Sequence, residues 1–347
     1  MIEPNARSVL PQELFVGNPC RVKRLIEQAI AFHALDLRGL TVYTETGSRN
    51  CMTTPIIAAM AGASRVTAIV QDSEYGKAAV IADYTNQFAE FCGAEQRVEV
   101  VFTKTPEAIG TADIVTNLGF VRPIDRQFVG MMKRKAVVPL MYESWECRSE
   151  DVDLAACRER EILVAGTNED FLGLDLFTYA GPICMKMLFE VEVEVYRCTL
   201  AVFSRDKFGE RIASALASAG AEVGLFSELT TQKAQDFLGR SDALILADYA
   251  GSEPVIGREG QITASDLSRL APSLVVVLFA GVVHTPDLRA AGVPVYPDAV
   301  IKPHKMYRLF ADLGPKPHVD LMAAGLKVGE LLAHGRDQSD LIQNIGL

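Results

Sequence analysis

Long apolar runs and an excess of positive charge are both missing from this sequence. No stretch approaches the roughly 18 consecutive apolar residues that a membrane-spanning helix needs, and the first fifteen residues lack a basic start followed by an apolar block. The formal net charge of −10 would repel nucleic acids and anionic membranes. We therefore expect a protein without a secretion signal that binds neither nucleic acid nor membrane. We also expect it to be a cytoplasmic homodimer that acts on a small molecule.

Cysteine pairs and metal-ligand spacings are also missing. The seven cysteines are scattered, with no C-x-x-C pair, which is typical of free thiols in a reducing compartment. Cys51 falls at an expected helix N-terminus, where its pKa would be lowered, although a buried thiol is the alternative. The histidines show no metal-ligand spacing, so we expect no metal.

What the sequence does contain is a regular alternation of short apolar runs and helical segments. The first set of runs lies at 40–43, 66–70, 98–102, 114–116, 137–141 and 162–165. A helical segment at 172–190 follows, and the pattern restarts at 200–203, 222–226, 243–246, 274–279 and 293–296. This alternation predicts an α/β fold of two doubly wound, Rossmann-like lobes with parallel sheets facing a central cleft. We place the first lobe at 1–170, the second, dinucleotide-binding-like lobe at 171–315, and a closing helix within 316–347 that packs back on the first lobe.

Several segments occur in an order that resembles the D-2-hydroxyacid dehydrogenase superfamily, also called formate/glycerate dehydrogenase-like, over roughly residues 110–335. The matching stretches are EDVDLAACREREILVAGTNE (150–169), the helical segment 170–190, SDALILADYAG (241–251), DLSRLAPSLVVVLFAG (266–281) and VIKPHKMY (300–307). The resemblance implies a two-lobed fold and an NAD(P)-dependent oxidoreductase acting on a small polar metabolite in the cleft between the lobes.

The sequence departs from this superfamily at the residues that carry its chemistry. The catalytic arginine, which clamps the substrate carboxylate, falls at Ala280, and a methyl group cannot form that clamp. No glutamate stands between Gly281 and His304, where the superfamily has a catalytic one. His304 alone keeps a clear counterpart, so the sequence argues against the usual 2-hydroxyacid reaction.

The second lobe has the order of a dinucleotide-binding unit without most of its glycines. The three places of the G-x-G-x-x-G turn hold Ser204, Asp206 and Gly209. Glu228 stands where an acid would bind the ribose of NAD or NADP. The Asp206 carboxylate would face phosphate unless Arg205 or Lys207 offsets its charge, and the alternative is that Asp206 simply caps the following helix. Both interpretations stay open at this point.

The first lobe offers a competing nucleotide site. Its opening strand, the turn at Gly47, a helix and a second strand ending at Asp72 resemble the Rossmann-like S-adenosylmethionine-dependent methyltransferases. In that interpretation Gly47 and Asp72 contact S-adenosylmethionine. The alternative is an ordinary turn at Gly47, with Asn50 or Thr53 capping the helix.

Polar residues at the strand ends are the candidates for the chemistry, since open α/β sheets bind ligands beyond the carboxyl ends of their strands. We expect the loop YESWE (142–146) to meet the loop KPHK (302–305) across the cleft. His304 would move the proton, Glu143 would be its carboxylate partner, and Trp145 would form a wall of the pocket. Lys302, with Lys305 or Arg122, would supply positive charge. The structural alternatives are core packing for Trp145 and a hydrogen-bonding strap for His304.

Three classes of function follow from these patterns. The first is a divergent NAD(P)-dependent oxidoreductase, and the second is a methyltransferase or another group-transfer enzyme that reuses the fold. The third is a non-catalytic protein that binds a nucleotide or another ligand, with both nucleotide fingerprints decayed. The sequence does not name the substrate.

Overall fold

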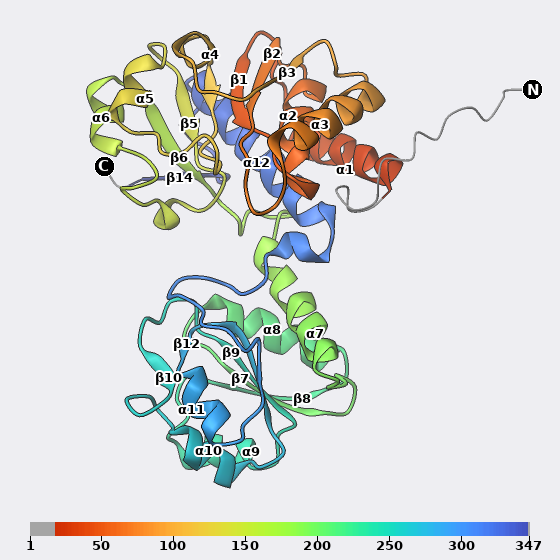
Figure 1. The fold of residues 1–347 in the computed structure, drawn as a ribbon, viewed down its shortest axis with the longest axis vertical. Helices are drawn as coiled ribbons and strands as arrows, with labels where there is room; N and C mark the ends of the chain where they lie inside the picture. Colours follow the sequence, from red (N-terminus) through yellow and green to blue (C-terminus); the bar gives the residue numbers. More distant parts are fainter. Residues whose placement is uncertain (1–17, 346–347) are drawn as a thin grey trace, which may run out of the picture. The chain divides into compact units, whose positions relative to one another are not determined.

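The computed structural model describes residues 18–345. The first fifteen residues, for which we expect no secretion signal, lie outside this range. The described chain divides into two compact units, of which the first comprises 18–175 and 314–345 and the second comprises 176–313. Each unit is built around its own parallel sheet (Figure 1), so the predicted α/β fold with two parallel-sheet lobes is confirmed.

The first unit holds a seven-stranded sheet in the order β14-β6-β5-β4-β1-β2-β3. The first six strands of the chain run parallel, and β14 lies antiparallel to β6 at one edge. These strands are β1 (Thr41–Glu45), β2 (Arg65–Ile69), β3 (Val98–Val101), β4 (Ile114–Val115), β5 (Val137–Pro139), β6 (Leu163–Thr167) and β14 (Ile342–Asn344). The direction of chain progression across the sheet reverses between β1 and β4, which makes this pair the switch point of the sheet.

Two groups of helices accompany this sheet (Figure 1). The first group packs together and contains α1 (Pro19–Phe32), α2 (Thr53–Met60), α3 (Ala78–Cys92) and α12 (Pro315–Ala333). The second group contains α4 (Pro106–Gly110), α5 (Arg126–Met131) and α6 (Leu154–Glu159). Two short 3-10 helices, η1 (Arg49–Met52) and η2 (Ser144–Glu146), follow strands β1 and β5.

The second unit holds a five-stranded, fully parallel sheet in the order β13-β11-β9-β7-β8. Its strands are β7 (Thr199–Phe203), β8 (Glu222–Phe226), β9 (Ala243–Ala247), β11 (Val275–Ala280) and β13 (Val295–Tyr296). A separate pair is formed by β10 (Pro254–Ile256) and β12 (Val282–Val283). The helices are α7 (Ala180–Glu190), α8 (Lys207–Ser218), α9 (Gln232–Leu238), α10 (Ala264–Leu270) and α11 (Thr285–Ala290), with η3 (Leu176–Tyr179) and η4 (Phe310–Leu313) at its two ends. Here the switch point lies between β7 and β9.

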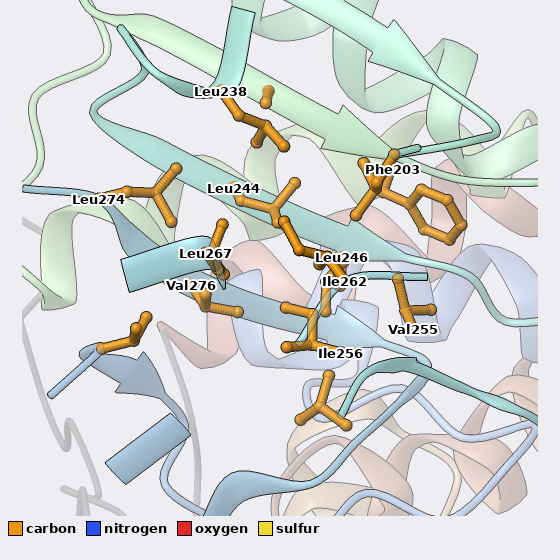
Figure 2. Close-up of a cluster of buried hydrophobic side chains, with 14 of the residues drawn as sticks. Phe203, Leu238, Leu244, Leu246, Val255, Ile256, Ile262, Leu267, Leu274 and Val276 are labelled. Carbon is orange, nitrogen blue, oxygen red and sulfur yellow. The ribbon is translucent and has the colours of Figure 1, made fainter. Parts of the chain in front are cut away.

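Buried apolar side chains cover both faces of this second sheet. Figure 2 shows one face, where side chains from β7, β9 and β11 meet side chains of α9 and α10: Phe203, Leu244, Leu246, Val276, Leu238 and Leu267. The opposite face packs against α7 and α8 through Ile183, Met187, Phe208, Ile212 and Leu216. Burial on both faces explains why strands such as ALILA (243–247) read as continuous apolar runs rather than as alternating ones.

The long helix expected at 172–190 is shorter in the structure. The α-helix begins at Ala180, and the turn η3 precedes it. Gly173 has a φ of +89° and Asp175 a φ of +41°, both in the left-handed region that an α-helix cannot contain. The connection into the second unit therefore starts as a turn and becomes helical only afterwards.

Candidate functional site

Each sheet has one switch point, and ligands of open parallel sheets bind beyond the carboxyl ends of the two strands that flank it. In the first unit these strands are β1 and β4, and in the second they are β7 and β9. Each of these two edges lies within one unit, so each can be described by itself.

The turn after β7 retains one structural feature of a dinucleotide fingerprint. The Ser204 hydroxyl donates a hydrogen bond to Asp206 Oδ1 at 3.1 Å, which closes the turn before α8. A Cβ atom on Gly209 would lie 2.4 Å from Ser204 Cβ and 2.9 Å from Leu225 Cδ1. Gly209 therefore lets α8 approach β7 and β8 closely, which is the role of the third glycine in the fingerprint.

Asp206 caps α8. One carboxylate oxygen accepts from the Phe208 N–H at 3.0 Å, and the other accepts from the Ala250 N–H at 3.0 Å, in the loop after β9. The capping interpretation of Asp206 is therefore the one that the structure shows. The carboxylate occupies part of the helix N-terminus that a pyrophosphate would use, and it also ties the two loops of the switch point together.

The two cations expected to offset Asp206 have other partners. Arg205 binds Asp248, with Nε 3.1 Å from Oδ1 and Nη2 2.6 Å from Oδ2. The Asp248 side chain is 0% exposed and that of Arg205 is 41% exposed, and the hydrogen bonds to Asp248 raise the pKa of Arg205. The Lys207 ammonium lies over the Phe177 ring, 3.5 Å from its centroid.

The Arg205–Asp248 pair spans the switch point, because Arg205 follows β7 and Asp248 follows β9. The backbone at Gly251 lies directly against this pair: a Cβ there would lie 1.9 Å from Asp248 Oδ2 and 2.5 Å from Arg205 Nη2. The sequence patterns did not single out Asp248. The signal that could have found it is a lone carboxylate placed directly after the apolar strand 243–247.

His304 stands beside the same loop. Its Nδ1 lies 3.0 Å from the Tyr249 carbonyl oxygen, and because a carbonyl can only accept, Nδ1 carries the proton in this contact. In the neutral ring Nε2 is then the acceptor, which is the form a general base requires. His304 is exposed, as are Lys302 and Lys305. Its φ of +57° marks a turn conformation that is uncommon for residues other than glycine.

The position expected for a catalytic arginine is buried. Ala280 is 0% exposed at the end of β11, and its carbonyl accepts from the Asp248 N–H at 3.2 Å. The loop that carries His304 is held to the same strand, because the Tyr307 N–H donates to the Phe279 carbonyl at 2.9 Å. Asp248 thus lies between Arg205 on one side and the arginine-free turn on the other.

Glu228 follows β8 by two residues and is exposed. Its Oε1 accepts a hydrogen bond from the Thr230 hydroxyl. Because β8 lies beside β7 in the sheet, Glu228 has the chain position and the exposure that a ribose-binding acid needs.

The turn after β1 is built differently. A Cβ on Gly47 would lie 2.9 Å from Cys51 Cβ, so this glycine accommodates the following 3-10 turn. The N-cap of α2 is Met52, without a side-chain bond, so the expected caps Asn50 and Thr53 are both wrong. Burial, and then the charge of Glu45, raise the pKa of Cys51 to about 11, so the predicted lowering of this pKa is wrong; the thiol is half-buried.

Two carboxylates at this first edge are engaged within the unit. Glu45 accepts from the Phe120 N–H at 2.5 Å across the switch point, and burial raises the pKa of Glu45. Asp72 accepts from Lys77 Nζ and from the Ala78 N–H, each at 2.8 Å, and the hydrogen bond from Lys77 lowers the pKa of Asp72. Asp72 therefore holds the start of α3.

The loop after β5 contains Glu143 and Trp145. Glu143 is buried and accepts from the Trp145 indole N–H and from Gln343 Nε2, the latter at 3.2 Å. Trp145 is 54% exposed, so the core-packing interpretation of Trp145 is wrong. Arg122 pairs with Asp151 at 2.8 Å. Glu143 and Trp145 lie in the first unit and His304 in the second, and their predicted meeting across a cleft stays a prediction.

Neither a protein-family model nor a curated protein sequence matches this chain. Solved structures, in contrast, match most of this chain. The A chain of dipicolinate synthase from Bacillus halodurans aligns with 88% of this chain and 100% of its own length, at 12% identity and a TM-score of 0.52. The corresponding chain from Bacillus subtilis aligns with 87% of this chain and 98% of its own, at 10% identity and a TM-score of 0.54. At 12% and 10% identity, these likenesses show a shared fold and nothing beyond it.

Two further observations concern the described residues alone. No helix among them is long and apolar enough to cross a membrane. No group of three or more histidine, cysteine, aspartate or glutamate side chains among them could hold a metal ion.

Proposed function

We propose that this chain is a divergent NAD-dependent oxidoreductase whose cofactor binds at the carboxyl ends of β7 and β9. The observation that carries this proposal is the construction of the β7 turn. A Cβ on Gly209 would lie only 2.4 Å from Ser204 Cβ, so α8 packs against the turn as closely as a glycine permits. Glu228 stands exposed at the end of the neighbouring strand. Together they reproduce the close helix approach and the acid position of a dinucleotide fold.

The acid after β8 supports NAD rather than NADP. A carboxylate at this position accepts hydrogen bonds from the ribose hydroxyls, whereas the 2′-phosphate of NADP would be repelled by it. The charge of Asp206 opposes the pyrophosphate of either cofactor, so we expect weaker binding than a glycine at this place would allow.

NAD supplies a hydride acceptor when it is bound. The chain's own contribution is the base: His304 Nε2 takes the proton of a substrate hydroxyl while the Tyr249 carbonyl holds Nδ1. Ala280 cannot clamp a carboxylate, so we expect other side chains to hold the substrate than in the usual 2-hydroxyacid reaction. Glu143 and Trp145 are our candidates for further substrate contacts, and Lys302 for the neighbouring positive charge.

A thermal-shift panel of NAD, NADP, S-adenosylmethionine and S-adenosylhomocysteine tests the proposal, since a ligand that binds only the folded state raises the melting temperature. We expect NAD to give the largest shift. Replacing Glu228 by alanine should weaken NAD binding about tenfold and reduce the preference over NADP. Glu222→Ala is the matched control, because Glu222 begins the same strand at its opposite end. A panel without any shift from NAD or NADP would contradict the proposal.

Asp206→Asn tests whether the pyrophosphate of NAD binds at the N-terminus of α8. Asparagine is an equally good N-cap, so α8 should keep its start while the negative charge and the hydrogen bond from the Ala250 N–H disappear. We expect this variant to bind NAD more tightly than the wild type. Unchanged or weaker binding would mean that the phosphates do not lie at the α8 N-terminus.

His304→Gln tests the assignment of the proton. In a screen of NADH oxidation with small carbonyl compounds, the variant should lose about 100-fold or more in rate. Its NAD-induced thermal shift should stay at the wild-type value. A variant that keeps its rate would remove His304 from the chemistry.

The first unit gives no argument of equal strength for S-adenosylmethionine. Gly47 is explained by its contact with Cys51, and Asp72 is held by Lys77 and the start of α3. A thermal shift with S-adenosylmethionine that disappears in Asp72→Asn would move the cofactor to this unit.

A further inference from the structure

Arg205 uses only one side of its guanidinium for Asp248. The contacts involve Nε and Nη2, and Nη1 forms no hydrogen bond with any other residue in the range 18–345 that the structure covers. A guanidinium has five N–H donors in a planar fork, so the edge formed by Nη1 and the second Nη2 proton stays available. The side chain is 41% exposed, which makes this edge accessible to a ligand.

The guanidinium is held in one place. Asp248 is completely buried, and taking its partner away would leave a buried charge without compensation. The backbone at Gly251 leaves no room between itself and the pair, because a Cβ added to this glycine would lie 1.9 Å from Asp248 Oδ2. Arg205 is therefore oriented before any ligand arrives, which lowers the entropic cost of binding.

Two carboxylates lie beside Arg205. Asp248 and Asp206 both raise the pKa of Arg205. Lys302 and Lys305 flank His304, whose ring contacts the residue directly after Asp248. Both carboxylates are already engaged in hydrogen bonds, and both lysines are exposed.

The other arginine pairs described in the second unit have more exposed acids. The acids that pair with Arg240, Arg269, Arg289 and Arg308 are 57%, 50%, 51% and 30% exposed, in that order. Exposed pairs contribute little to stability. Arg205 is paired with a fully buried acid at a switch point, which is where a ligand of an open sheet is expected.

We propose that the open edge of Arg205 binds an oxyanion with two oxygens, and so stands in for the arginine that position 280 lacks. This proposal rests on the proposed function for the site as a whole, but it concerns the anion alone. The oxyanion is either a substrate carboxylate or a cofactor phosphate, which share the geometry that a guanidinium edge recognises.

Arg205→Lys tests whether the planar edge of the guanidinium, rather than its positive charge alone, binds the anion. Lysine can still pair with Asp248, but it lacks the planar fork. Titration calorimetry with oxalate, inorganic pyrophosphate and NAD should show at least about tenfold weaker binding of the recognised anion. Arg240→Lys, at the amino edge of the same sheet, should leave all three affinities unchanged.

The three probes identify the source of the anion. Loss of oxalate binding alone assigns the edge to a carboxylate, and loss of pyrophosphate and NAD binding assigns it to the cofactor. Gly251→Ala provides a second variant, because its Cβ would push the intact arginine away and should produce the same loss. If neither variant weakens any of the three probes, the proposal is overturned.

The two proposals fail in different ways. Wild-type protein that binds oxalate or pyrophosphate through Arg205 but shows no affinity for NAD or NADP would support the anion site and contradict the oxidoreductase. If the wild type binds NAD and Arg205→Lys binds NAD, oxalate and pyrophosphate with the same affinities as the wild type, the oxidoreductase is supported and the anion site is contradicted.

Discussion

The turns after β1 and after β7 follow corresponding strands in two sheets, yet they are built for different purposes. Helix α8 starts directly after the β7 turn, is capped by Asp206, and buries one face through Phe208, Ile212 and Leu216. Helix α2 starts only after the 3-10 turn η1, has no side-chain cap, and is buried along 53–59. The difference teaches that a glycine after a Rossmann strand can belong to the core, as Gly47 does, rather than to a ligand site.

The acids at the two switch points also differ. In the first unit Glu45 accepts directly from a backbone N–H on the other side of the switch point. In the second unit Asp248 holds a half-exposed arginine through Nε and Nη2. The first edge is therefore closed by a carboxylate, whereas the second presents a cation.

Removing the two partners of the second edge should have unequal effects. Arg205→Ala leaves Asp248 buried and unpaired, and we expect a loss of about 3–5 kcal/mol in the free energy of unfolding. Asp248→Ala should cost clearly less, because Arg205 is 41% exposed and can turn into water. Urea unfolding of both variants measures the difference. Equal losses would mean that Asp248 is hydrated despite its position.

Acid should destabilise the first unit through a buried histidine. Burial, and then the charge of Lys327, lower the pKa of His33 from 6.5 to about 4. Between these values the unfolded chain binds a proton that the folded chain does not, so stability is present above pH 6.5 and is lost as the pH falls towards 4. At about 1.4 kcal/mol per pKa unit the loss from His33 is about 3 kcal/mol. Burial of His318, with its pKa also lowered to about 4, adds in the same direction.

His33→Gln checks this prediction by thermal unfolding at several pH values. The variant should lose less stability than the wild type between pH 6.5 and 4. His284→Gln, in the second unit, is the comparison variant with an exposed histidine, 57% exposed. A slope that His33→Gln does not reduce would show that the acid sensitivity has another origin.

The two turn glycines should respond to alanine with different strength. In Gly209→Ala the new methyl group would meet Ser204 and Leu225 at 2.4 and 2.9 Å, whereas in Gly47→Ala it would meet only Cys51, at 2.9 Å. Overpacking of this kind costs about 1–3 kcal/mol, and we expect Gly209→Ala near the upper end and Gly47→Ala near the lower. Chemical denaturation of the two variants gives the order, and a reversed order would refute our account of the β7 turn.

The strands could be predicted from the sequence because burial on both faces produces uninterrupted apolar runs, such as the one at 243–247. The pairing of Arg205 with Asp248 could not, because it joins residues 43 positions apart that only the strand order brings together. The function of Asp206 depends on the same kind of information, because its partners include the Ala250 N–H, 44 positions away, besides the Phe208 N–H. The exposure of Trp145 does not follow from the sequence, because a lone tryptophan carries no periodic pattern.

The smallest expected effect on stability concerns Asp206 and Ser48, the residues that directly precede α8 and η1. Asp206→Ala removes two hydrogen bonds to backbone N–H groups and should cost about 1 kcal/mol, the usual effect of losing an N-cap. Ser48→Ala should change the free energy of unfolding by less than about 0.5 kcal/mol, because Ser48 precedes η1 without a side-chain cap bond. Differential scanning calorimetry of the two variants makes the comparison, with the Asp206 variant melting lower. A Ser48 variant that melts as low as the Asp206 variant would show that the β1 turn depends on a polar cap after all, and that the contrast between the two turns is not one of capping.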